Sequence, residues 1–225
     1  MKKATNDLII NGHGSVTGGK YNSVSINGSG RIDGDLECIS LKINGQCTLN
    51  GNVKADSVKV NGNNSIEGNL EAEKVNVKGT TDIKGNLSAD KAETYGSISI
   101  DGDCNAEFLK IEGSFRIGGF LNADELELSL YGPSLANEIG GSEITVKKSG
   151  KISFLGIKSK IMPDGKNKLT ADVIEGDDVY LENTTANVVR GNNVTIGSGC
   201  KIELVEYKND LKMHEGAEVG IDKKL

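Results

Sequence analysis

Apolar and polar residues alternate along this chain in short runs that are separated by glycines. In the stretch 57–73, for example, the apolar or small positions are Val58, Val60, Ile66, Leu70 and Ala72. Steps of two residues predict β-strands, because alternate side chains of a strand point to opposite faces. A helix would need apolar residues every three or four positions, and the glycines would interrupt it.

The same pattern recurs as a block of seventeen residues, six times between Ser23 and Asp124 and without insertion or deletion. Glycine takes the sixth position of every block, at Gly28, Gly45, Gly62, Gly79, Gly96 and Gly113. It also takes the twelfth, at Gly34, Gly51, Gly68, Gly85, Gly102 and Gly119. A short fixed period predicts stacked units that each contact only their neighbours. Glycine permits the positive φ of a sharp corner.

We therefore predict an all-β fold, a right-handed parallel β-helix with triangular coils of about 17 residues. The right hand follows from the handedness of parallel crossover connections. It also follows from the glycines, which lie alternately six and eleven residues apart and make the three sides unequal. Left-handed β-helices use three equivalent short repeats instead.

The period divides the chain into segments, as follows: a short N-terminal tail (1–6), a regular β-helix (7–130), an irregular segment (131–168) with a basic apolar loop (147–168), C-terminal β-helix coils (169–207) and a charged tail (208–225). The C-terminal coils follow from a shorter repeat, in which Val173-Ile174-Glu175-Gly176 matches Val188-Val189-Arg190-Gly191 fifteen residues later. We expect the charged tail to fray.

The basic apolar loop is the one unusual charge feature. It holds seven lysines and one acidic residue, in a chain whose formal net charge is −6. It is either a surface loop whose apolar residues pack on the flank of the rod, or a protrusion that contacts an anionic membrane surface. The predicted membrane-contact residues are Lys147, Lys148, Lys151, Phe154, Leu155, Ile157, Lys158 and Lys160. Nucleic acid is not an expected partner, because the rest of the rod is acidic and would repel phosphates.

Other site chemistry is weak, and we expect no catalysis, no cofactor and no metal. There is no GxxxxGK[ST] phosphate loop and no CxxC pair. We interpret the four cysteines as small core-facing thiols. A corner ladder of carboxylates is interpreted as solvated charge: Asp56, Glu73, Asp90, Glu107 and Asp124. A second ladder is interpreted as stacked amides: Asn52, Asn69 and Asn86. The polar start, which leads into a strand, favours a cytoplasmic location.

The two ends of the predicted rod show no amphipathic helix that would cap them. Uncapped coils of matching shape expose strand edges that pair with another copy. We therefore predict that the chain polymerises end to end. The predicted polymerisation interface is formed by Leu8, Ile10, Val16, Ile202, Leu204, Val205 and Tyr207.

These features resemble the bactofilins, bacterial cytoskeletal proteins that polymerise. The resemblance rests on glycine-cornered coils such as Ser57-Val58-Lys59-Val60-Asn61-Gly62, and on the closing segment from Val173 to Val194. The longer bactofilin-like proteins of Gram-positive bacteria are the most similar. The resemblance implies a right-handed β-helix and nucleotide-independent, non-polar filaments. It also implies association with the inner face of the membrane and with cell-wall-associated proteins that organise the envelope or cell shape.

Two other functions stay open. One is a β-helical binding module whose flat flank grips a glycan or a protein partner without polymerisation. The other is a surface adhesin, which would require a longer precursor with a secretion signal. The irregular segment is open as well, because it could be a membrane loop or a joint between two rods.

Overall fold

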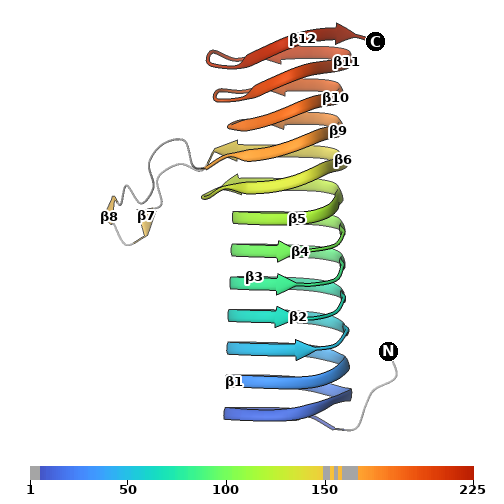
Figure 1. Ribbon diagram of the computed structural model, residues 1–225, viewed down its shortest axis with the longest axis vertical. Coiled ribbons are helices and arrows are strands. Elements are labelled where there is room, and N and C mark those ends of the chain that lie inside the picture. The colour runs from blue at the N-terminus through green and yellow to red at the C-terminus, as the bar shows by residue number, and fades with distance from the viewer. Residues whose placement is uncertain (1–5, 149–152, 155–156, 159–166) are drawn as a thin grey trace.

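The computed structural model describes residues 6–148, 153–154, 157–158 and 167–225, and the regular structure in these ranges is all β. The main body is one rod of stacked coils (Figure 1). Its parallel sheet has the order β1 (Leu8–Asn50), β2 (Val53–Ile66), β3 (Leu70–Ile83), β4 (Leu87–Ile100), β5 (Cys104–Leu130), β6 (Ser134–Lys148), β9 (Leu169–Leu181), β10 (Thr184–Ile196), β11 (Lys201–Met213) and β12 (Glu218–Lys224). The predicted right-handed parallel β-helix with about 17 residues per coil is confirmed.

One sequence block corresponds to one coil. Val58 of β2 pairs with Val75 of β3, and Val75 pairs with Ala92 of β4. The same spacing appears in the side-chain contacts, since the hydrogen bond from the Asn69 backbone to Asn52 spans 17 residues. Equivalent positions of successive blocks therefore form columns along the rod.

The two rows of glycines serve different purposes. In the central coils the sixth-position glycines have φ between +130° and +139°: Gly45, Gly62, Gly79 and Gly96. A Cβ on Gly62 would also lie 2.1 Å from the carbonyl oxygen of Gly45. In the twelfth-position row Gly34 has a positive φ of +102°, but Gly68 does not. Gly68 is required instead by close approach, because its Cβ would lie 2.7 Å from the Gly51 carbonyl group.

The interior of the rod consists of buried apolar columns. One column contains Leu41, Val58, Val75, Ala92 and Leu109, which pair in register and are at most 3% exposed. Each side chain contacts the coils on both sides of its own. Burial, and with it most of the stabilisation, therefore depends on stacking rather than on any single coil.

The irregular segment expected at 131–168 is in part a regular coil. Ile144 of β6 pairs with Leu126 of β5 and with Val179 of β9. The sequence does not reveal this coil because the spacing changes. Partners across β5 and β6 lie 19 residues apart up to Ile117 and 18 residues apart from Phe120 on, instead of 17. One continuous rod runs from β1 to β12, and the alternative of two rods with a joint at this segment is excluded.

The expectation that 208–225 frays is wrong. Residues 208–213 complete β11, and β12 pairs with β11 through Ile202–Val219 and Leu204–Ile221. Leu211 and Val219 pack against the core, so this segment adds one more coil to the stack. Its charged side chains lie at exposed positions and do not prevent pairing.

Candidate functional site

The N-terminal residues of the predicted polymerisation interface lie together in the first coil. Ile10 is 7% exposed, and Leu8 and Val16 are half-buried against the core. The amide of Asn27 donates a hydrogen bond to the side chain of Asn11 at 3.0 Å, which places the first coil in register with the second. These three residues therefore form the start of the interior columns at this end.

The C-terminal residues of that interface lie one coil inside the end of the rod. Ile202 and Val205 are 2% and 0% exposed. β12 covers them, because Ile202, Leu204, Val205 and Tyr207 all pair with its residues. The sequence analysis placed them at the end because it treated 208–225 as a frayed tail. They are part of the core and flank of the penultimate coil.

The apolar residues at this end are ones that the sequence analysis missed. Leu211 and Met213 pair with Val194 and Ile196 of β10, and Met213 is 54% exposed. Ala217 and Val219 are half-buried against the core. The alternation of Leu211, Lys212 and Met213 could have identified this end in the sequence, because it continues the period-two pattern into the charged segment.

The two ends of the rod belong to the same interior columns. Register pairing connects Leu211 through Val194, Val179 and Ile144 to Leu126. It also connects Leu109 to Leu41, and the seventeen-residue period joins Leu109 to Leu126. A neighbouring interior column begins with Ile10 at the N-terminal end of the rod and finishes with Met213 at the C-terminal end. Among the described residues no helix covers either end (Figure 1). In the described residues, each end thus presents an open coil edge beside apolar side chains.

Part of the predicted membrane-contact set belongs to the rod. Lys147 and Lys148 end β6, and the backbone N–H of Lys148 donates to Glu182 at 2.8 Å. Phe154 lies in β7 (Ser153–Phe154), and Ile157 and Lys158 form β8 (Ile157–Lys158), which pairs antiparallel with β7. Lys151, Leu155 and Lys160 lie outside the described residues. In the described part of the chain no helix is long and apolar enough to cross a membrane.

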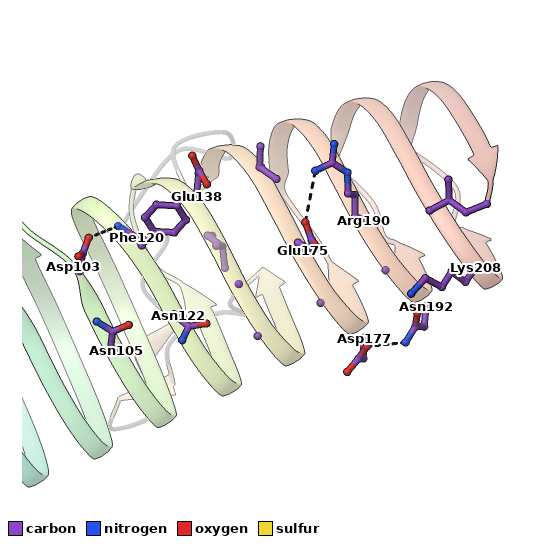
Figure 2. A pocket seen from close by; sticks show the side chains of 17 residues that line it. Asp103, Asn105, Phe120, Asn122, Glu138, Glu175, Asp177, Arg190, Asn192 and Lys208 are labelled. Carbon is purple, nitrogen blue, oxygen red and sulfur yellow. Dashed lines mark hydrogen bonds and ion pairs between the residues drawn. The ribbon is translucent and has the colours of Figure 1, made fainter.

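A groove of about 750 Å³ runs along one flank of the C-terminal half of the rod (Figure 2). Its floor lacks side chains because glycines occupy it: Gly140, Gly141, Gly176 and Gly191. Phe120, which is 54% exposed, and Val173 line it, and so do charged residues. The side chain of Asn192 donates to Asp177 at 2.7 Å, as Figure 2 shows.

Arg190 is the centre of the charged cluster in this groove. Its guanidinium lies 2.8 Å from Glu206 and 3.6 Å from Glu175. The hydrogen bond from Arg190, helped by one from Lys223, lowers the pKa of the Glu206 carboxyl. The Glu206 carboxylate is therefore held ionised, as the partner of two cations. The arrangement suits a charged docking surface better than proton transfer, which needs a pKa near the working pH.

The predicted ladder of amides is confirmed, and it is longer than expected. The side-chain oxygens of Asn52, Asn69 and Asn86 each accept the backbone N–H of the residue 17 positions later, at 2.8 to 2.9 Å. Asp35 begins the ladder, and Asp103 ends it by accepting from the N–H of Phe120 at 2.8 Å. The ladder ties coils together, so it is structural.

The carboxylate corner and the cysteines carry no site either. In the described ranges no group of three potential metal ligands comes together, the carboxylate corner included. All four cysteines are buried and free, which confirms them as core-facing thiols. Burial raises the pKa of Cys38 to about 11 and those of Cys47 and Cys104 to about 12, so these thiols stay protonated and unreactive.

Comparison with known proteins gives relatives but no function. No protein-family model and no solved structure matches the chain. YhbF, an uncharacterized protein of Bacillus subtilis (strain 168), is 52% identical over 85 residues, which are 37% of this chain and 32% of YhbF. YhbE of the same organism, also uncharacterized, is 42% identical over 95 residues, which are 42% of this chain and 38% of YhbE. The similarity thus spans only about a third of the length of each relative.

Proposed function

We propose that this protein is a cytoskeletal scaffold subunit that polymerises end to end into filaments without a nucleotide, as its resemblance to bactofilins implies. The observation that carries the proposal is the state of the two rod ends. Each described end presents an open coil edge and half-buried apolar side chains from the same interior columns. A second rod placed there continues both the sheet and the core.

Two physical terms favour such a joint. The edge of a parallel coil has unpaired backbone groups, and pairing them across the joint resembles the addition of a strand to a sheet. Burial of Leu211 and Met213 at one end, or of Leu8 and Val16 at the other, removes apolar surface from water. Joints between like ends and between unlike ends both bury apolar groups.

The proposed filament lies in the cytoplasm at the inner face of the membrane, where it organises envelope or shape machinery. The basic apolar loop is the proposed membrane contact. Its position supports this role, because β6 pairs directly with β9 and the residues between Lys148 and Asn167 are an insertion between two neighbouring strands. Cell-wall-associated proteins are the proposed partners.

The proposal is tested by placing a charged side chain at the C-terminal end of the rod. We expect the wild-type protein to form filaments in negative-stain electron micrographs without added nucleotide. Leu211→Asp should give soluble single rods, because the joint would bury an unpaired carboxylate. The matched control is Lys212→Asp on the same strand, whose side chain is 69% exposed and which should still polymerise.

Circular dichroism should show that both variants keep the β fold. Filaments that persist in Leu211→Asp would count against the end-to-end joint. The residues first predicted from the sequence are poor test sites, because a carboxylate at the buried Val205 would disrupt the last two coils themselves.

The flank groove favours a second candidate function. A binding module for a glycan or a protein partner would use this open, partly apolar surface, with its amide and charged groups, instead of the rod ends. A wild-type protein that stays a single particle at high concentration, in sedimentation and in micrographs, would favour that function over the filament.

A further inference from the structure

An apolar column lies on the outside of the last four coils. Val173, Val188, Leu204 and Ile221 are register partners in successive strands. Their neighbours Ile174 and Val189 point into the core and are fully buried, so this column faces outward. Ile221 is 63% exposed, and the other three are half-buried.

In the earlier coils the same column is polar from Asp35 to Asp103 and continues through Phe120 and Glu138. Val173 pairs with Glu138, which pairs with Phe120, and Phe120 follows the ladder that ends at Asp103. Figure 2 shows Asp103, Phe120 and Glu138 in succession beside the groove. The change from Asn and Asp to Val, Leu and Ile is not required by packing inside the rod, because these side chains point away from it. An outward-facing apolar column that is partly exposed over four successive coils is typical of an interaction surface.

A charged column runs beside it, two residues further along each strand. Its members alternate in sign: Glu175, Arg190, Glu206 and Lys223. Within the chain they form a ladder of ion pairs, with distances of 3.6, 2.8 and 3.2 Å in that order. The ladder holds the side chains in place, yet Glu175, Arg190 and Lys223 are between 44% and 64% exposed and can still face a partner.

We infer that this face, formed by the apolar and charged columns, pairs side by side with the same face of a second copy that runs in the opposite direction. A two-fold axis between Arg190 and Glu206 reverses the order of both columns. Glu175 then lies opposite the partner subunit's Lys223, and Arg190 lies opposite Glu206 of the partner subunit. Val173 lies opposite the partner's Ile221, and Val188 lies opposite the partner's Leu204.

The sequence of charges selects this arrangement. Every position of the reversed charged column meets the opposite sign, and every position of the apolar column meets an apolar side chain, which makes the face self-complementary as a two-fold interface requires. Two rods running in the same direction with their charged columns in contact would place each charge opposite its own copy. Like charges across an interface disfavour that pairing.

The face is small, and this determines its role. Four coils at about 4.8 Å each span about 19 Å along the rod. A typical stable interface buries about 800 Å² per partner, which corresponds to a square patch about 28 Å on a side. Single rods therefore pair weakly. In a filament the contact repeats in every subunit, and many weak contacts add up to firm lateral association. This accumulation rests on the proposed end-to-end assembly, whereas the pairing of two rods does not.

The experiment exchanges the charges between two separate variants. Arg190→Glu and Glu206→Arg each place like charges opposite one another in a homodimer. In a mixture of the two, every opposing pair is again of opposite sign. The background is Leu211→Asp, which removes the proposed end joint, and self-association is measured by sedimentation velocity at increasing concentration.

We expect each single variant to associate about tenfold more weakly than the parent rod, since two contacts change from attractive to repulsive, and the equimolar mixture to recover the parent association. Self-association that is unchanged in both variants, or a mixture no better than its components, would overturn the proposal. A face that binds a glycan or a foreign protein while rods fail to pair would overturn it too.

Two controls separate this result from other causes. Phe120→Ser removes an exposed apolar residue of the same column outside the four paired coils, and it should leave association unchanged. In the background that retains Leu211, Arg190→Glu should give single filaments where wild type gives laterally paired ones.

Wild-type protein without any filaments would contradict the proposed function alone, because the mixing test uses rods that cannot join at their ends.

Discussion

At the scale of single residues, the main constraint is the contact between a residue and its counterparts in the neighbouring coils. Asn69 shows this on the outside of the rod, where its side chain accepts from the backbone of Asn86 while its own backbone N–H donates to Asn52. Gly62 shows it at a corner, where any side chain would meet the carbonyl oxygen of Gly45. Residue identity is therefore determined mainly along columns, and only secondarily along the chain.

This constraint gives a prediction for the corner glycines. Gly34 and Gly62 both have positive φ, but a Cβ on Gly34 would have no neighbour closer than 3.8 Å, against 2.1 Å for Gly62. Gly34→Ala should cost about 1–2 kcal/mol, the strain of a left-handed conformation. Gly62→Ala should cost more than about 3 kcal/mol, because the backbone must also shift and lose ladder hydrogen bonds of about 1 kcal/mol each.

The measurement is urea denaturation followed by circular dichroism, with both variants and wild type under the same conditions. Equal losses in the two variants would show that φ alone requires glycine at these corners. The distance to the preceding coil would then have no part in the requirement.

At the scale of elements, the regular coils were predictable and the changes of spacing were not. A strict seventeen-residue period fixes which residues pair from β1 to β5, so the fold class and the core of these coils followed from the sequence. The coil that contains β6 was not recognised, because its partners in β5 lie 18 or 19 residues away instead of 17, and its partners in β9 lie beyond an insertion. β12 was not recognised because charged residues at its exposed positions masked the alternation.

The candidate site was predictable only in part, for the same reason. Leu8, Ile10 and Val16 were assigned to the correct end, since the first coil keeps the order of apolar and glycine positions although it is one residue shorter. Leu204 was assigned to an end joint, but the structure places it on the outer flank beneath β12. The two outer columns of the last coils were recognisable only in part. The fifteen-residue repeat aligns Glu175 with Arg190, but Glu206 lies sixteen residues after Arg190 and Lys223 lies in the segment that was expected to fray.

The insertion between β6 and β9 gives a prediction at this scale. Replacement of 150–165 by a short Gly-Ser linker should leave the rod folded, because Ser134 to Val146 already pair with Leu169 to Leu181. The same deletion should abolish co-sedimentation with anionic liposomes, because it removes Lys151, Lys158 and Lys160 together with the apolar residues between them. Lys147 and Lys148 are kept, since they belong to β6.

A variant in which Lys151, Lys158 and Lys160 are replaced by Gln keeps the length of the loop and is the matched control for the deletion. It should bind liposomes less than wild type does, and wild-type binding should weaken as salt is raised. Undiminished binding of the deletion variant would remove the membrane contact from the proposal. It would leave the end-to-end joint untouched.

At the scale of the whole molecule, the rod is a one-dimensional stack in which each coil contacts only its neighbours. The central coils are covered on both sides, whereas the first and last coils are covered on one. Local opening should therefore cost least at the two ends, as in other repeat proteins. Lateral pairing on a flank should change local opening much less, because it covers side chains and leaves the backbone hydrogen bonds between coils unchanged.

Amide hydrogen exchange uses this difference to locate the assembly contacts. In Leu211→Asp single rods, we expect the amides of the first coil (8–22) and of the last coil (211–224) to exchange fastest. In wild-type filaments, protection should rise at these two coils, because the strand edges become hydrogen-bonded across the joint and each end coil gains a second neighbour. β3 and β4 serve as the internal reference, since their exchange should be the same in both states. A gain of protection confined to the flank of β9 to β12, with the end coils still open, would mean that rods associate only sideways, and the end-to-end filament would then be ruled out.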